Sequence, residues 1–260
     1  MHSYLGMQLV FENGRVKVDM TYYLEKVLKE FDDLMSEVLP GKKNLFASSL
    51  ESPMLLEKDK ASFHTVAVKL LYLSRRARSD IIPAVRFLCT RVQRSTEEDN
   101  MKLKRLLGYL LKTRKQILVL QPLQSFKVVA YINASFAIHS DGKSHTRIMV
   151  FVAGVAVYCA LQKQKRVSKS PTEAELVALS DNLGFVELFH EFVSFLVNDK
   201  IKKPLIYQDN TLVISMVTNG GGITRTKHMR TWMFLVLESL KEQRVTIRYI
   251  HTSGMIADGL

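Results

Sequence analysis

Residues 125–136 read SFKVVAYINASF, and this stretch, together with the segments around it, decides the fold class. Valine, isoleucine and aromatic side chains dominate it, which is typical of a β-strand. Three neighbouring stretches have the same character, namely residues 116–123, 147–157 and 157–163. The turn residues His139-Ser140-Asp141-Gly142 separate 125–136 from 147–157, so we predict antiparallel hairpins here.

Beyond residue 163 the sequence predicts alternating helices and strands. A helix is expected from Ser170-Pro171-Thr172 past His190, because serine or threonine caps a helix and proline suits its first turn. The later predicted elements are strand 205–208, helix 211–217, helix 231–243, strand 245–250 and a helix that starts at Ile256. Hairpins followed by such alternation indicate an α/β domain with a mixed sheet and flanking helices.

The first part of the chain has a different, mainly helical pattern. It opens with a predicted β-hairpin, residues 5–11 and 15–19, around Asn13-Gly14, which is a strong turn signal. The predicted helices start at Thr21, run over 63–78, start at Ser79-Asp80, and start at a capping box formed by Ser95 and Glu98. We therefore predict a smaller helical region over residues 1–120 and an α/β domain over residues 121–260.

The composition narrows the class of partner. With 47% hydrophobic and 24% charged residues, the chain is neither disordered nor fibrous. Its 37 Lys and Arg against 25 Asp and Glu give a net charge of +12, which favours a polyanionic partner, nucleic acid first. The longest uncharged apolar run, residues 148–161, is shorter than the roughly 20 residues of a membrane helix. We expect an intracellular protein, cytoplasmic or nuclear, that does not bind membranes.

Three acidic residues of the second part occupy informative places. Glu175 lies in the first turns of the predicted helix, Asp209 follows strand 205–208, and Asp258 follows the last strand. In an open α/β sheet such places converge on one rim, and carboxylates are the ligands that Mg2+ prefers. The spacing therefore predicts a Mg2+ site that faces a phosphate backbone. It leaves open the alternative that these are ordinary helix-start, turn and cap residues.

Five sequence blocks follow one another in the second part: 129–136 (VAYINASF), 164–175 (QKRVSKSPTEAE), 207–210 (YQDN), 226–228 (TKH) and 256–260 (IADGL). In this order they resemble the ribonuclease H domain of copia-type retrotransposon Pol polyproteins. The first part carries blocks at 4–7 (YLGM), 69–73 (KLLYL), 78–81 (RSDI) and 106–110 (LLGYL). These are similar to the segment that follows the polymerase active site of the same reverse transcriptases. The resemblance covers nearly the whole chain.

The resemblance implies a ribonuclease-H-like fold in which four acids hold two Mg2+ ions, or Mn2+, and the RNA strand of an RNA–DNA hybrid is cut. Glu175, Asp209 and Asp258 match the second, third and fourth acids, whereas Asn133 stands at the position of the first. An amide offers one neutral oxygen where a carboxylate offers two anionic ones. Two dications about 3.5–4 Å apart need negative charge between them. We therefore expect weak or no cleavage.

The polymerase centre of the family is not matched. Its Tyr-x-Asp-Asp turn would precede the block at 4–7, and the only Asp-Asp pair here, Asp32-Asp33, is interpreted as a solvated helix end. We interpret the chain as a fragment of a retroelement reading frame. The alternative is a catalytically dead relic that binds nucleic acid.

Two basic clusters are candidates for contact with nucleic-acid phosphates. The first precedes the Glu175 helix and contains Lys163, Lys165, Arg166 and Lys169. The second precedes the last long helix and contains Arg225, Lys227 and Arg230. Lys and Arg supply the charge that neutralises a phosphate backbone. For the second cluster, a solvated helix start is an equally good interpretation.

Overall fold

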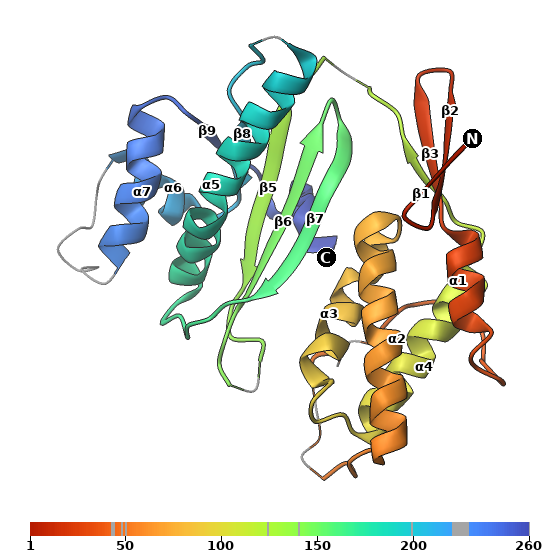
Figure 1. Ribbon diagram of the computed structural model, residues 1–260. Coiled ribbons are helices and arrows are strands. Elements are labelled where there is room, and N and C mark those ends of the chain that lie inside the picture. Colours follow the sequence, from red (N-terminus) through yellow and green to blue (C-terminus); the bar gives the residue numbers. More distant parts are fainter. Residues whose placement is uncertain are drawn as a thin grey trace. The chain divides into compact units, whose positions relative to one another are not determined.

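The computed structural model describes residues 1–42, 45–47, 49, 51–123, 125–139, 141–198, 200–219 and 229–259 (Figure 1). The chain divides into two compact units, Met1–Gln121 and Pro122–Leu260. Each unit has its own hydrophobic core, so each is described by itself. The assignment of these units to a post-polymerase region and a nuclease domain stays a prediction.

The first unit contains a four-stranded antiparallel sheet of order β1-β2-β3-β4. Its strands are β1 (His2–Tyr4), β2 (Met7–Glu12), β3 (Arg15–Asp19) and β4 (Leu118–Leu120). The predicted hairpin is confirmed, because Asn13 and Gly14 both take positive φ between β2 and β3, as a two-residue hairpin turn requires. The strand predicted at 116–123 is shorter than expected and pairs with β3, so it belongs to this sheet.

The described part of the first unit also contains four α-helices, namely α1 (Thr21–Leu28), α2 (Glu57–Arg76), α3 (Ile82–Arg91) and α4 (Glu97–Lys112), and a 3₁₀ turn, Ser79–Ile81. Two predicted caps are wrong by one residue. Met20, not Thr21, precedes α1, and it makes no side-chain cap. The capping box of α4 is formed by Thr96 and Asp99. Asp99 is buried and pairs with Arg91 at 3.1 Å, which favours its register over that of the partly exposed Glu98.

The second unit contains a mixed five-stranded sheet of order β7-β6-β5-β8-β9. Its strands are β5 (Val128–Ser135), β6 (His145–Val152), β7 (Val155–Lys163), β8 (Leu205–Gln208) and β9 (Thr246–Tyr249). The pairs β5/β6 and β6/β7 are antiparallel, and β5/β8 and β8/β9 are parallel. The boundary at residue 157 between the strands predicted at 147–157 and 157–163 is wrong, since the chain reverses at Ala153-Gly154, where both residues take positive φ.

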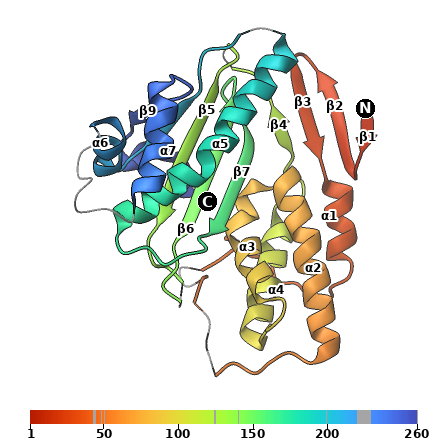
Figure 2. The same cartoon turned by 60° about the vertical axis from the view of Figure 1, so that its left-hand side comes forward.

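Helices flank this sheet, which confirms the predicted α/β class with a mixed sheet and flanking helices. They are α5 (Pro171–Val197), α6 (Thr211–Asn219) and α7 (Arg230–Lys241). Figure 2 shows α5 lying across the sheet. Ser170 caps α5 as predicted, with its side chain accepting a hydrogen bond from Glu173 N at 3.2 Å. The helix predicted from Ile256 is only a short 3₁₀ turn, Ile256–Gly259.

The buried face of the sheet supplies the core of the second unit. Small and branched side chains of the central strands pack beneath α5, among them Ala130, Ile132, Ile148 and Val150. Because side chains alternate along a strand, Tyr131 and Asn133 face the other side of the sheet. The helix–sheet contact therefore fixes the direction in which Asn133 points.

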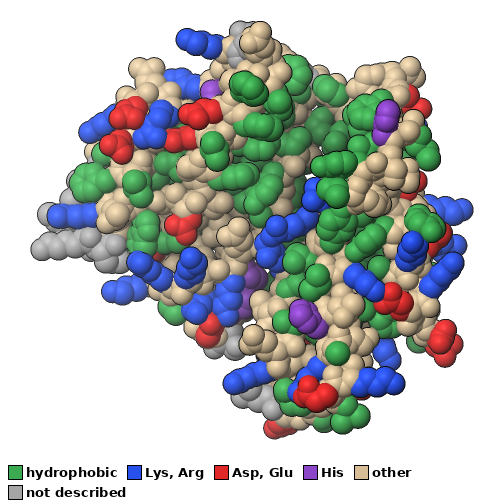
Figure 3. Space-filling model, in the orientation of Figure 1, with side chains coloured by type: hydrophobic (Ala, Val, Ile, Leu, Met, Phe, Trp, Pro, Cys, Tyr) green, Lys and Arg blue, Asp and Glu red, His purple; other side chains and the backbone are tan. Residues whose placement is uncertain are grey.

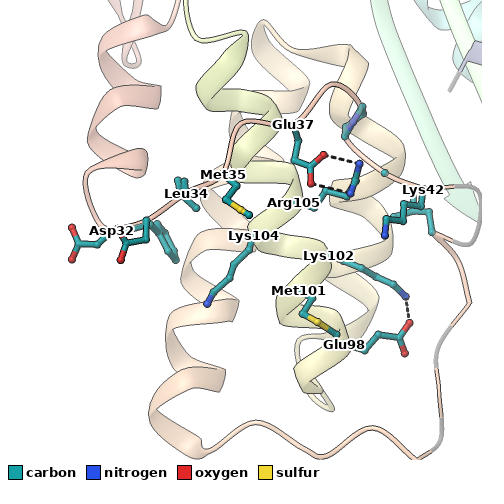
Figure 4. Close-up of a pocket in the computed structure, with 15 residues that line it drawn as sticks. Asp32, Leu34, Met35, Glu37, Lys42, Glu98, Met101, Lys102, Lys104 and Arg105 are labelled. Atoms are coloured by element: carbon teal, nitrogen blue, oxygen red, sulfur yellow. Dashed lines mark hydrogen bonds and ion pairs between the residues drawn. The ribbon is translucent and has the colours of Figure 1, made fainter.

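In the first unit, the segment after α1 packs closely against α4 (Figure 4). Glu37 N donates a hydrogen bond to Gly108 O at 3.3 Å, and the Glu37 carboxylate pairs with Arg105 at 2.7 Å. A cavity of about 740 Å³ lies beside this contact and is lined by both segments. A Cβ atom on Gly108 would lie 2.0 Å from the Met35 carbonyl oxygen. Glycine is therefore required at 108 by the approach of the backbone.

We predict that Gly108→Ala lowers the free energy of unfolding by about 1–3 kcal/mol, because the backbone at Met35 must move. Gly184→Ala is the matched control. Gly184 lies in α5 with nothing within 4 Å of the added Cβ, so alanine there raises stability by up to about 1 kcal/mol. Urea unfolding followed by circular dichroism measures both. Equal effects of the two substitutions would contradict the close approach.

Candidate functional site

Asn133 stands near the end of the central strand β5 and is 6% exposed. Its side-chain Nδ2 donates a hydrogen bond to Asp258 Oδ1 at 2.6 Å. Its Oδ1 accepts a hydrogen bond from Ala134 N at 2.6 Å. Both polar atoms of the Asn133 amide therefore form hydrogen bonds, and the nitrogen donates to a neighbouring acid.

Glu175 is brought to the same strand by α5, because it lies in the second turn of a helix whose start Ser170 defines. Its Oε1 accepts a hydrogen bond from Ala134 N at 2.9 Å. The pKa of Glu175 is raised to about 8, mainly by burial and also by the negative charges of Asp209 and Asp258, while the hydrogen bonds from Ala134 N and Gln208 lower it. Glu175 is therefore largely protonated at neutral pH.

Gln208 is the last residue of β8, and its side chain connects Glu175 of α5 to the end of β8. Its Nε2 donates to Glu175 Oε2 at 3.3 Å, and its Oε1 accepts from Asp209 N at 2.8 Å and Asn210 N at 3.0 Å. Gln208 is fully buried. Sequence reasoning gave this residue no role, although it lies inside the block at 207–210.

Asp209 leaves β8 at the rim of the sheet, where its Oδ2 accepts a hydrogen bond from Thr252 Oγ1 at 3.0 Å. Asp258 lies in the 3₁₀ turn 256–259, against the ends of β5 and β6. Burial and the charge of Asp209 raise the pKa of Asp258, whereas Arg147 and the Asn133 amide lower it; burial is the largest of these effects. The carboxylates are therefore close enough to repel one another.

Arg147 is the second residue that sequence reasoning missed. Its Nη1 donates to Asp258 Oδ1 at 3.1 Å and to the Asp258 main-chain oxygen at 3.3 Å. Arg147 lies on β6 directly opposite Asn133 in the antiparallel pair. No spacing rule reveals this position, because it depends on the register of β5 against β6.

The structure thus gathers the four predicted residues, Asn133, Glu175, Asp209 and Asp258, at one rim of the mixed sheet. Asn133 contacts Asp258 and shares the Ala134 N–H with Glu175, and Gln208 connects Glu175 to Asp209. That these residues bind metal or catalyse a reaction stays a prediction.

The oxygen donors of this rim suit Mg2+ in their chemistry but not in their arrangement. Asp258 Oδ1 already accepts from Asn133 and from Arg147. Across the described ranges, no three His, Cys, Asp or Glu side chains form a group able to hold an ion. As they lie, the residues do not fit a pair of Mg2+ ions, and the expectation of two ions stays a prediction.

The basic cluster before α5 lies on the surface of the second unit. Lys163, Lys165, Arg166 and Lys169 are exposed. Lys163 pairs with Asp141 at 2.8 Å, and the Arg166 guanidinium lies 5.8 Å from the Trp232 ring centroid. Figure 3 shows Lys and Arg interspersed with apolar and acidic side chains on one face of the molecule.

The second basic cluster is only partly described. Arg230 begins α7, and its Nε is buried without a hydrogen-bond partner among the residues that the structure describes. Arg225 and Lys227 lie outside the described residues. A role for this cluster in nucleic-acid contact stays a prediction.

The raised pKa of Glu175 predicts a pH-dependent stability. An unfolded glutamate releases its proton near pH 4.5, whereas folded Glu175 keeps it up to about 8, so the folded state binds more protons between these values. The free energy of unfolding therefore falls as pH rises through this window. Glu175→Gln removes this loss. The free energy of unfolding of the variant, relative to that of the wild type, therefore rises by roughly 2–4 kcal/mol between pH 5 and pH 8.

Urea unfolding in EDTA at the two pH values measures this difference. Glu191→Gln, an exposed position of the same helix, is the control and should show no such gain. If the difference in free energy of unfolding between Glu175→Gln and the wild type does not change with pH, Glu175 is ionised in the folded protein.

The chain is similar to a plant mitochondrial protein and to the Pol polyproteins of plant transposons. It is 29% identical over 185 residues to an uncharacterized mitochondrial protein of Arabidopsis thaliana, covering 69% of this chain and 75% of that protein. It is 25% identical over 203 residues to the retrovirus-related Pol polyprotein from transposon RE1 of the same plant, covering 78% of this chain and 14% of the polyprotein. The Pol polyprotein from transposon TNT 1-94 of Nicotiana tabacum is 26% identical, covering 98% of this chain and 20% of the polyprotein. No family model matches the chain.

Solved structures similar to part of the chain include ribonuclease H1 of Halobacterium salinarum. That match has 16% identity and a TM-score of 0.39, and covers 50% of this chain and 90% of the other. LC11 ribonuclease H1, solved with an RNA/DNA hybrid, has 11% identity and a TM-score of 0.39, and covers 52% of this chain and 93% of the other. The relatives confirm the resemblance to transposon Pol polyproteins that the sequence blocks indicate, and this chain spans only a fifth or less of those polyproteins.

Proposed function

We propose that the chain is part of a copia-type Pol polyprotein, in which residues 121–260 form a ribonuclease-H-type domain that binds RNA–DNA hybrids. Residues 1–120 are then the post-polymerase region of the reverse transcriptase. The observation that carries the proposal is the convergence of Asn133, Glu175, Asp209 and Asp258 at one rim of the mixed sheet. Relatives that are transposon Pol polyproteins support it.

Hydrolysis by this domain is impaired at Asn133. By the resemblance, divalent ions would be held by Glu175, Asp209, Asp258 and the residue at position 133, and they would supply activation of water and stabilisation of charge. Position 133 carries an amide, so the formal charge of the four side chains is −3 where four acids would give −4. The described contacts of these acids include those to Asn133, to Gln208 and to the Ala134 backbone N–H.

A second candidate function, a nucleic-acid-binding domain without catalysis, is favoured by one specific observation. Asp258 Oδ1 accepts hydrogen bonds from two protein donors, Asn133 Nδ2 and Arg147 Nη1, so this oxygen is already occupied by protein groups. Binding of a hybrid would then depend on the basic surface alone.

Among the residues described, no helix is both long enough and apolar enough to pass through a bilayer.

Hybrid binding is tested with the double substitution Lys165→Gln/Arg166→Gln, measured by fluorescence anisotropy of a labelled RNA–DNA hybrid in EDTA. We expect weaker binding and a slope of log K against log salt that falls by about one for each lost phosphate contact. Lys200→Gln/Lys202→Gln is matched in charge and precedes β8, at the end opposite Asp209. Equal loss in both variants would contradict a local hybrid-binding surface.

Hydrolysis is tested by comparing wild type with Asn133→Asp on a labelled hybrid with Mg2+ and then Mn2+. Restoring the carboxylate should increase cleavage on the order of 10²-fold or more, because several kcal/mol of charge stabilisation return. Asn100→Asp adds the same charge in the first unit and should leave cleavage unchanged. A folded Asn133→Asp protein no faster than wild type would overturn the assignment of Asn133 as the limiting position.

A further inference from the structure

The charge balance of the acidic rim depends on Arg147, a residue to which neither the sequence blocks nor the relatives give a role. We propose that Arg147 is a built-in counter-ion that closes the acid cluster to divalent cations, so that metal affinity is set by Arg147 as well as by Asn133. The inference rests on the proposed function, which treats this cluster as the hydrolytic centre.

The position of Arg147 follows from strand register. Arg147 on β6 and Asn133 on β5 are direct Cα partners in an antiparallel pair. Directly opposite residues present their side chains on the same face, with Cβ atoms about 4.5–5.5 Å apart. Both side chains then reach one acceptor, Asp258 Oδ1, at 2.6 Å from Asn133 Nδ2 and 3.1 Å from Arg147 Nη1. The two side chains act on the same oxygen.

Among the described residues, the Arg147 guanidinium is held by Asp258. The Arg147 side chain is 17% exposed, and its Nε is buried without a hydrogen-bond partner among the described residues. Burying a charge is costly unless an opposite charge compensates it. The described compensation comes from Asp258, through its carboxylate and its main-chain oxygen. Arg147 is therefore an integral part of the acidic cluster.

A metal ion and Arg147 compete for the same place. A cation that binds Asp258 Oδ1 has to displace two donors and then lies within a few ångströms of a fixed positive charge. Like charges at such distances repel strongly inside a protein, where the effective dielectric constant is far below that of water. Restoring an acid at position 133 leaves this repulsion in place, because the new carboxylate would face the same guanidinium across the strand pair.

The test measures Mn2+ affinity by calorimetry, independently of cleavage, in Asn133→Asp, Asn133→Asp/Arg147→Gln and Asn133→Asp/Lys202→Gln. The Lys202 substitution removes the same charge at an exposed site before β8. We expect Arg147→Gln to tighten Mn2+ binding by roughly tenfold or more over Asn133→Asp alone, with no change from Lys202→Gln. Equal affinity in the three proteins would overturn the proposal.

A purely structural role for Arg147, holding the turn 256–259 in place, gives a different result. Arg147→Gln would then lower the Tm without tightening Mn2+ binding, which also overturns the proposal. Arg147→Met provides a second variant if Arg147→Gln does not fold. Tighter Mn2+ binding without hybrid cleavage would overturn the hydrolytic part of the proposed function and leave the role of Arg147 standing. The measurement of hybrid binding in EDTA, made on Lys165→Gln/Arg166→Gln, tests the proposed function alone.

Discussion

The rim of the second unit depends on one backbone group, the N–H of Ala134. It donates to Glu175 at 2.9 Å and to the side chain of Asn133 at 2.6 Å, one residue before β5 ends its pairing with β6 at Ser135. Because this N–H lies on the central strand, it joins α5 to the sheet and sets the distance between two of the four rim residues. The remaining contacts extend outward from this junction, through Gln208 to Asp209 and through Asn133 to Asp258.

The rim is held together by polar contacts in spite of unfavourable charge. Three carboxylates lie close enough for Asp209 to raise the pKa of both Glu175 and Asp258. A neutral amide, a guanidinium and a proton on Glu175 together offset that repulsion. The protein's own groups therefore occupy several of the acid oxygens of the rim.

Several features of this structure were predictable because they depend on neighbouring residues only. Ser170 caps α5 through a side chain three residues from its partner, and Asn13-Gly14 defines the hairpin between β2 and β3. The convergence of Glu175, Asp209 and Asp258 followed from the rule that strand ends and helix starts share a rim.

Other features were not predictable, because they depend on packing and register. The Thr96–Asp99 box was missed by one residue, since the choice between neighbouring caps depends on the burial of Asp99 beside Arg91. The Ala153-Gly154 turn lies inside the continuous apolar stretch 148–161. Because polar and apolar residues do not alternate there, the sequence pattern does not show where one strand ends and the next begins. Arg147 was missed because its partner is defined by the β5/β6 register alone.

Asn133 has a consequence for how mutation can act on the rim. Asparagine has nearly the size and shape of aspartate, and its amide donates a hydrogen bond that Asp258 accepts. An asparagine at this place therefore brings no charge, opens no void and occupies an oxygen of a neighbouring acid. Under the function proposed above, the side chain that weakens cleavage also favours the fold, so a screen for stability would keep it and a screen for cleavage would reject it.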